Sequence, residues 1–251
     1  MDALEALGIA GAGLVAGTIN TVVGSGTLIT FPVLLAFGYP PVTANVSNTL
    51  GLVPGSVAGA FGYRRELAGQ GPRLRRLVPA TVLGGIAGAV LLLTLPPGAF
   101  ARIVPALIGL ALVLVIIQPW LARRLAARGR DRPEHGGPLL WIGILLTGVY
   151  GGYFGAAQGV LLLAVMGILL SDPVQRLNAA KNVFGAVANL VSGIVFVFAA
   201  HVAWLVVLLI AVGSTAGGLI GARIGRKLPP IALRVIIVAV GVVAIVRLLV
   251  P

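Results

Sequence analysis

Cysteine is absent from this 251-residue chain, and charged side chains are scarce. Without cysteine the chain forms no disulfide, thiol nucleophile or Cys-ligated metal site. Charged residues make up 10% of the chain, whereas a soluble domain has about 25%. The phosphate-binding pattern G-x-x-x-x-G-K-[ST] is missing as well, so the chain carries no ATP motor of that type. The sequence gives no indication of a cofactor.

Hydrophobic residues make up 59% of the chain, in long runs that cover nearly its whole length. Most runs are close to the roughly 20 residues that a helix needs to cross a bilayer. We therefore expect an all-α polytopic membrane protein, embedded in a lipid bilayer, with some segments short or broken. The ten expected segments are Ala3–Val23, Thr27–Phe37, Thr43–Phe61, Leu77–Leu95, Phe100–Trp120, Leu139–Phe154, Gln158–Leu170, Val174–Ala199, Val202–Ala222 and Ile231–Val250.

The basic residues predict an orientation. The chain has 18 Lys and Arg residues, and all except Arg102 and Arg247 (18 minus 2 is 16) fall on one side of the predicted topology. The positive-inside rule makes that side cytoplasmic, which places both termini outside the plasma membrane. The net charge of +12 is explained by this topology, because no basic surface interleaved with aromatic residues accompanies it. We expect no nucleic-acid partner.

Several short patterns recur in the second half of the chain. Gly17 and Gly24 correspond to Gly148 and Gly155, and two longer motifs recur in the same order. Two halves of five segments each must have opposite orientations, which is the inverted repeat typical of secondary transporters. The predicted parts are a first repeat (1–121), a basic cytoplasmic linker (122–138) and a second repeat (139–251). The longer motif pairs are Asn45–Thr49 with Asn178–Asn182, and Leu95–Pro97 with Leu228–Pro230.

The triplet Gly24-Ser25-Gly26 interrupts the first half, and the run after it has only about eleven residues. A helix of that length spans about 17 Å, too little to cross the bilayer. We expect this break and its counterpart at 155–157 to lie inside the membrane, where irregular backbone lines a cavity or is buried. Each break begins a helix whose free N–H groups favour an anion, with Ser25, Thr27 and Gln158 adding hydrogen bonds. The alternative is that the triplet is only a tight turn.

Polar residues recur along one helical face in each half. Asn45, Asn48, Thr49 and Ser56 have the same spacing as Asn178, Lys181, Asn182 and Asn189. Amides are costly in lipid, so both stripes should face the bundle interior, either lining a transport pathway or joining helices. Lys181 is a charge inside a membrane segment and a candidate anion ligand. The alternative for Lys181 is a snorkelling side chain that covers apolar surface.

The six acidic residues fall only in predicted loops or ends: Asp2, Glu5, Glu66, Asp131, Glu134 and Asp172. No carboxylate is therefore predicted in the membrane interior, and an obvious site for a coupling proton or sodium ion is missing. An anion leaving a cell with a negative interior needs no such coupling ion.

Two stretches resemble the half-signatures of the TauE/SafE sulfite exporter-like family of permeases. The first is G-T-I-N-T-V-V-G-S-G-T-L-I-T-F-P-V-L-L-A-F-G-Y-P-P-V-T-A-N, and the second is L-N-A-A-K-N-V-F-G-A-V-A-N-L-V-S-G-I-V-F. The resemblance implies transport of sulfite, thiosulfate or organosulfonates such as sulfoacetate. The second Gly-rich signature departs from the pattern, since Gly155-Ala-Ala-Gln158 stands in place of Gly-Ser-Gly-Thr. By position the signatures contain Asn20, Ser25, Thr27, Asn45, Asn48, Asn178, Lys181 and Asn182.

The sequence thus predicts a membrane permease for a small sulfur-containing anion, with export favoured. A passive channel, and a membrane subunit that acts only with partners, remain as alternatives, and a homo-oligomer stays open. An intramembrane enzyme with Ser25 as nucleophile is a weaker reading, because no buried His or Asp is predicted to activate it. The expected substrate-binding residues are Asn20, Ser25, Thr27, Asn45, Asn48, Thr49, Gln158, Asn178, Lys181, Asn182 and Asn189.

Overall fold

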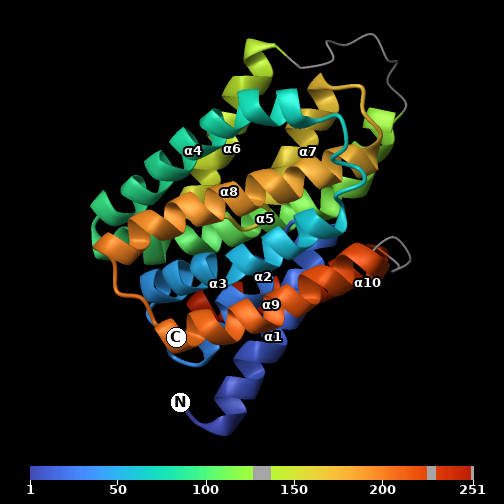
Figure 1. The fold of residues 1–251 in the computed structure, drawn as a ribbon. Helices are drawn as coiled ribbons and strands as arrows, with labels where there is room; N and C mark the ends of the chain where they lie inside the picture. Colours follow the sequence, from blue (N-terminus) through green and yellow to red (C-terminus); the bar gives the residue numbers. More distant parts are fainter. Residues whose placement is uncertain (127–136, 225–229, 250–251) are drawn as a thin grey trace.

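The computed structural model describes residues 1–126, 137–224 and 230–249, and these residues form ten helices and no strand (Figure 1). The all-helical fold with ten segments is therefore confirmed. The predicted linker falls largely on residues 127–136, outside the described residues. The helices are α1 (Ala3–Val22), α2 (Thr27–Ala36), α3 (Pro41–Gly62), α4 (Gly71–Thr94), α5 (Pro97–Ala126), α6 (Pro138–Tyr153), α7 (Gln158–Leu169), α8 (Val174–Ala199), α9 (Trp204–Ile224) and α10 (Pro230–Leu249).

Several helices begin at or next to a proline, a few residues before the start that the apolar runs predicted. α3, α5 and α6 begin at Pro41, Pro97 and Pro138, and α4 has a proline in its first turn. Proline suits this position because its fixed φ matches a helix and its missing N–H has no intrahelical partner there. α5 also continues through residues 122–126, which the sequence assigned to the linker.

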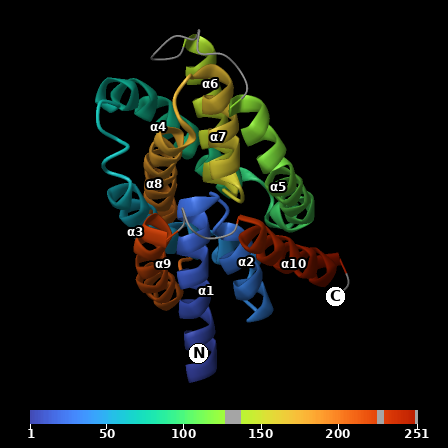
Figure 2. The same cartoon turned by 90° about the vertical axis from the view of Figure 1, so that its right-hand side faces the viewer.

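Two helical hairpins enter the molecule from opposite ends. α1 and α2 come from the end that holds the N-terminus, and α6 and α7 come from the other end, so that their turns meet at mid-height (Figure 2). We call residues 23–26 the first tip and residues 154–157 the second tip. α2 has 10 residues and α7 has 12, which confirms that both segments are too short to cross a bilayer.

Glycines bring the hairpins against their neighbours. α1 of the first hairpin packs on α9, and α6 of the second hairpin packs on α4. A Cβ added to Gly17 of α1 would lie 2.2 Å from the carbonyl oxygen of Ser214, and one added to Gly88 of α4 would lie 2.1 Å from that of Val149. Small residues at both interfaces thus allow backbone contact between helices, as is common in membrane bundles.

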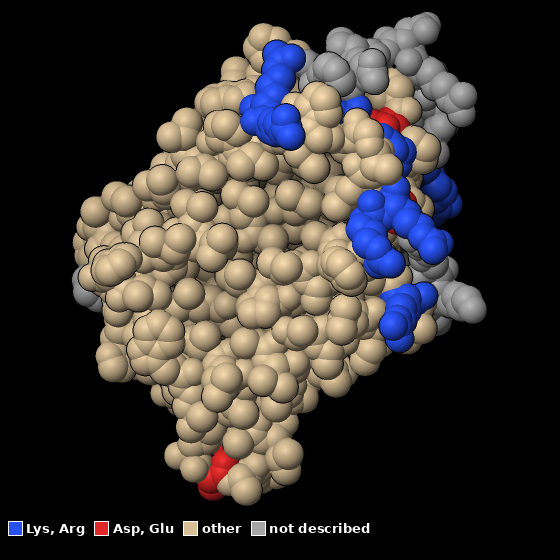
Figure 3. Space-filling view, viewed as in Figure 1, with Lys and Arg blue, Asp and Glu red and all other residues tan. Residues whose placement is uncertain are grey.

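The long helix α3 lies between α8 and α9 and packs against both of them (Figure 1). Among the described residues, five helices are long and apolar enough to cross a membrane: those in α1, α4, α5, α8 and α9. Lys and Arg side chains gather along one margin of the surface, and most of the remaining face is uncharged (Figure 3). We call this margin the arginine-rich end, formed by residues 64–76, 123–124, 172–176 and 223.

Candidate functional site

The first tip touches the first turn of α7 through the backbone of Gly24 and Gly159. The Gly159 N–H donates to the Gly24 carbonyl oxygen at 3.1 Å. A Cβ on Gly24 would lie only 2.4 Å from the Gly159 Cα, and Gly24 has a φ of 89°, which side chains rarely adopt. Glycine is therefore required in the first tip for both its conformation and its close approach to α7.

The second tip has a different construction. Gly155 has a φ of 76°, and Ala157 is left-handed at 58° although it carries a side chain. Such a residue costs about 1 to 3 kcal/mol and persists only where its surroundings hold it. Here the Tyr150 hydroxyl donates to the Ala156 carbonyl at 2.5 Å, and Gln158 Nε2 donates to the Thr147 carbonyl at 3.2 Å.

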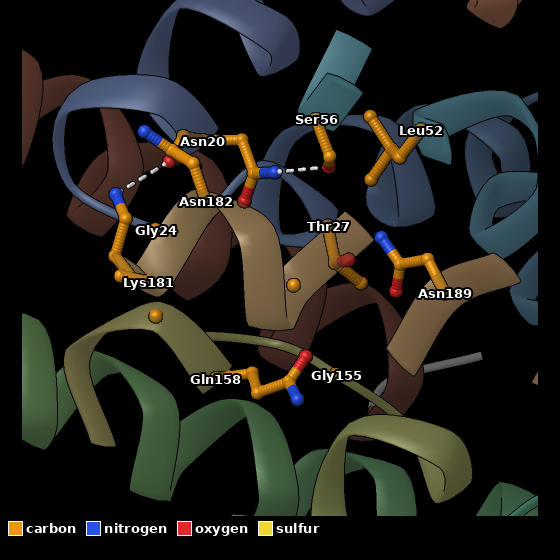
Figure 4. A pocket seen from close by; sticks show the side chains of 12 residues that line it. Asn20, Gly24, Thr27, Leu52, Ser56, Gly155, Gln158, Lys181, Asn182 and Asn189 are labelled. Atoms are coloured by element: carbon orange, nitrogen blue, oxygen red, sulfur yellow. Dashed lines mark hydrogen bonds between the residues drawn. The ribbon is translucent and has the colours of Figure 1, made fainter. Parts of the chain in front are cut away.

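A small polar cavity lies beside the contact of the tips, about halfway along α3 and α8 (Figure 4). Its volume is about 20 Å³, enough for roughly one water molecule. An anion with several oxygens needs more room than this cavity provides. The cavity is lined by Asn20, Gly24, Thr27, Leu52, Ser56, Gly155, Gln158, Gly159, Lys181, Asn182, Gly185 and Asn189.

Lys181 lies at one edge of this cavity and is 2% exposed. Its Nζ donates to the carbonyl oxygens of Asn20 and Thr21, each at 3.0 Å, in the last turn of α1. It forms no ion pair within the described part of the chain. The snorkelling interpretation is therefore wrong, because the ammonium group is held inside the bundle at the C-terminus of a broken helix.

Asparagines of α3 and α8 cap the two broken helices in a reciprocal way. Asn178 and Asn182 of α8 donate to the Thr21 carbonyl at the end of α1, at 3.3 and 3.4 Å. Asn45 of α3 donates to the Tyr153 carbonyl at the end of α6, at 3.1 Å. Together with Lys181, these amides bind carbonyls at the ends of α1 and α6, where a helix leaves its last carbonyls without intrahelical partners. Each long helix thus stabilises the hairpin of the other half.

The N-terminal half of α3 holds α2. Asn48 bonds to the hydroxyl of Thr27, at 3.1 Å, and to that of Thr30. The Thr49 hydroxyl bonds to the carbonyl of Asn45 within its own helix. Asn20 connects α1 with α3 through Ser56, at 3.1 Å, and its oxygen accepts from the Gly26 N–H in the first tip. Polar side chains of α1 and α3 therefore hold the start of α2 beside the cavity.

The predicted residues divide into two groups. Six line the cavity, namely Asn20, Thr27, Gln158, Lys181, Asn182 and Asn189. The other five lie behind it as buried supports of the tips or of α3, namely Ser25, Asn45, Asn48, Thr49 and Asn178. The sequence interpretation missed Leu52 and Gly185 as lining residues and left Ser56 outside the predicted site. Leu52 lies four residues after Asn48, and Gly185 lies four residues after Lys181. Residues four apart share a helix face, so the spacing could have predicted both.

The Ser25 hydroxyl makes no hydrogen bond to a base within the described residues. It is fully buried, and no hydrogen-bond partner for it exists in the described ranges. His201 lies in the exposed turn between α8 and α9. A serine nucleophile needs a positioned base, so the geometry gives no support to the enzyme alternative.

Comparison with known proteins identifies the family. The sequence model described as "Sulfite exporter TauE/SafE" matches residues 9–248. The "Probable membrane transporter protein YfcA" of Escherichia coli is 26% identical over 240 residues, covering 94% of this chain and 86% of the relative. A "Probable membrane transporter protein" of Haemophilus influenzae is 27% identical over 214 residues, covering 84% and 81%. No solved structure matches. The chain therefore belongs to the sulfite exporter TauE/SafE family and is a membrane transporter.

Proposed function

We propose that the protein is a permease for a small sulfur-containing anion such as sulfite, thiosulfate or sulfoacetate, and that the anion binds in the cavity between the tips. The observation that carries the proposal is Lys181, a buried ammonium group without a carboxylate partner among the described residues. A charge held inside a membrane bundle is costly and marks a functional site.

Helix ends explain how Lys181 favours an anion. Each tip contains one helix C-terminus, where carbonyls give a negative end, and one helix N-terminus, where N–H groups give a positive end. Lys181, Asn178 and Asn182 compensate the carbonyl end of α1. The starts of α2 and α7 then remain as positive ends beside the cavity, which favours a guest of negative charge.

Side-chain donors around the cavity suit an oxyanion. Asn20, Thr27, Gln158 and Asn189 place amide and hydroxyl groups on the cavity wall from α1, α2, α7 and α8 (Figure 4). These neutral donors can bind several oxygens of one anion without the high cost of adding further charges to the membrane interior. Because the cavity is small, binding is expected to be coupled to separation of the two tips.

The overall arrangement supports export across the plasma membrane. With the arginine-rich end in the cytoplasm, both termini lie outside, and residues 1–121 and 139–251 act as two inverted repeats. A membrane potential of about 100 mV, negative inside, is worth about 2.3 kcal/mol per charge, so an outgoing dianion gains about 4.6 kcal/mol. Export therefore needs no coupling ion, in agreement with the absence of acidic residues from the cavity wall.

Thermal stability of the purified protein tests the proposal. The melting temperature is measured against sulfite, thiosulfate, sulfoacetate, taurine, sulfate and chloride. A ligand that binds only the folded state stabilises it by about 2.7 kcal/mol at a hundred times its Kd. We expect a saturable rise with one sulfur anion. Equal shifts with chloride, or no shift with any sulfur anion, would refute the substrate class.

A further inference from the structure

A second, much larger cavity lies between α2 and α10 at the periphery of the bundle (Figure 2). Its volume is about 850 Å³, within the range of about 300 to 1,000 Å³ that is typical of ligand pockets. Its walls come from α2, from the turn 38–41 and from residues of α10 between 239 and 244. It has no lining residue in common with the polar cavity. We call it the α2–α10 groove.

Small side chains leave this groove open. Ala36 of α2 and Ala239 and Ala244 of α10 belong to its walls. Small residues bring α1 onto α9 and α6 onto α4, as they commonly do in membrane bundles, but here they border open space. α10 rests instead on α5, where a Cβ added to Gly241 would lie 2.5 Å from Leu112 Cδ2. The small residues that face α2 are therefore left without a packing partner on that side.

Prolines stiffen the wall on the α2 side. Pro32 lies inside α2, and Pro40 and Pro41 lie in the turn that leads into α3. The ring of proline fixes φ, so these residues limit how far the wall can move into the groove. A wall that is fixed in advance lowers the conformational cost of binding a guest.

The lining of the groove favours an apolar guest with one polar end. Among the residues that line it, Tyr39 has the only polar side chain, and its hydroxyl donates to Glu5 Oε1 at 2.9 Å. Buried water needs two to four polar partners, which this lining does not offer. Tyr39 lies between α2 and the start of α3, at the end of the molecule opposite the arginine-rich end. Tyrosine at such a position is typical of the boundary between the bilayer and water.

The groove is continuous with apolar surface that faces the bilayer. Val243 lines the groove and is 60% exposed, and the neighbouring Phe37 is 40% exposed. Acyl chains are the apolar molecules that surround a membrane transporter at this surface. We propose that the α2–α10 groove binds one phospholipid, with an acyl chain along the groove and the head group at the Tyr39 end.

The lipid site lies behind the helix that begins at the first tip. Thr27 and Thr30 of α2 bond to Asn48 of α3. Pro32 follows Thr27 by five residues, which places it about 140° around the helix from Thr27. The acyl chain therefore packs against the side of α2 that α3 leaves uncovered. This site does not depend on which anion the protein transports.

Photo-cross-linking of the purified protein in detergent tests the site. The protein is titrated with phosphatidylethanolamine that carries a diazirine on one acyl chain, and adducts are located by mass spectrometry of its peptides. Ala36→Phe and Ala239→Phe fill the groove from its two walls, and both residues are exposed, so neither change disturbs the core. The matched control is Val212→Phe, at an exposed position of α9 outside the groove.

We expect adducts on α2 and α10 to saturate as the lipid is added, whereas adducts on the exposed face of α9 rise in proportion to it. Each groove variant should lower the adducts on α2 and α10 about tenfold or more, the effect of displacing roughly two methylene groups, and Val212→Phe should leave them unchanged. Adducts that do not saturate, or groove variants without effect, would overturn the site. A dimer whose α2 and α10 are protected from the probe would identify a second copy of the chain as the occupant and would overturn it as well.

Discussion

Lys181 both caps the end of a broken helix and lines the cavity. Its Nζ satisfies the carbonyls of Asn20 and Thr21 at the end of α1, and its side chain also forms part of the cavity wall. The sequence predicted a functional charge at Lys181, because this residue lies two turns inside an apolar segment. The sequence could not identify its partners, because carbonyl acceptors belong to the backbone and have no signal in side-chain patterns.

Replacing Lys181 tests both roles. Lys181→Ala and Lys181→Met each remove two charge-assisted hydrogen bonds, and we expect a loss of stability of about 1.5 to 3 kcal/mol for each bond. Met keeps most of the stem that packs against Gly159, so it separates the loss of charge from the loss of packing. Both variants should lose the stabilisation by anion in melting experiments. A Lys181→Met protein that keeps this response would show that the charge is not needed for binding.

Glycine at the first tip is a second requirement at the scale of one residue. Gly24 and Gly38 have nearly the same backbone, with φ of 89° and 85°, but a Cβ on Gly38 meets nothing within 4 Å. Gly38→Ala should therefore cost only the conformational strain, about 1 kcal/mol. Gly24→Ala should cost clearly more, because its Cβ collides with Gly159. Melting temperatures in detergent compare the two, and equal losses would contradict the close contact of the tips.

At the scale of helices, the hairpins α1–α2 and α6–α7 follow from the sequence in outline. The short runs after Gly26 and Ala157 predicted helices that could not cross the membrane, and α2 and α7 are short. The reciprocal caps by Asn45 and Asn178 were not predictable, because each joins residues more than 100 positions apart. Spacing along one helix reveals a polar face but not which helix end that face contacts.

Helix packing through glycine can be tested in α4. Gly88 lies against α6, where an added Cβ would come within 2.1 Å of the Val149 carbonyl oxygen. Gly109 of α5 is a matched helical glycine with nothing within 4 Å. We expect Gly88→Ala to destabilise the protein by about 1 to 3 kcal/mol, as overpacking does, and Gly109→Ala to have little effect. Thermal unfolding of the two variants checks this, and a stable Gly88→Ala protein would argue against the tight α4–α6 interface.

At the scale of the whole molecule, the distribution of charge predicts an orientation in the membrane. Arginines gather at one end, which the positive-inside rule places in the cytoplasm (Figure 3). The chain is naturally free of cysteine, so single cysteines can be introduced without background. This property permits a direct labelling experiment in intact cells.

His201→Cys and Arg65→Cys place thiols at exposed positions of opposite ends, in the α8–α9 turn and the α3–α4 loop. A maleimide that does not cross membranes should label position 201 in intact cells and position 65 only after permeabilisation. The permeabilised sample controls for thiol reactivity. The reverse pattern would invert the topology and turn the energetic argument for export into one for import.

The identity of the substrate is the property that the sequence pattern predicts least well. Gly24, Gly159 and Lys181 line a small polar cavity, but its volume of about 20 Å³ does not select among anions. In the proposed mechanism, selectivity depends on how the tips separate. Neither helix spacing nor composition contains that motion, which is why the substrate enters through family resemblance and stays a proposal.

Counterflow of sulfite in proteoliposomes tests the central claim most directly. Vesicles loaded with unlabelled sulfite are diluted into a trace of labelled sulfite, and accumulation is followed over time. We predict transient, saturable accumulation in wild type and in the control variant Arg76→Gln, which changes an exposed arginine of α4, and its loss in Lys181→Met. Flux without counterflow would indicate a channel, and no sulfite or thiosulfate flux above protein-free vesicles would contradict a sulfur-anion permease built around Lys181.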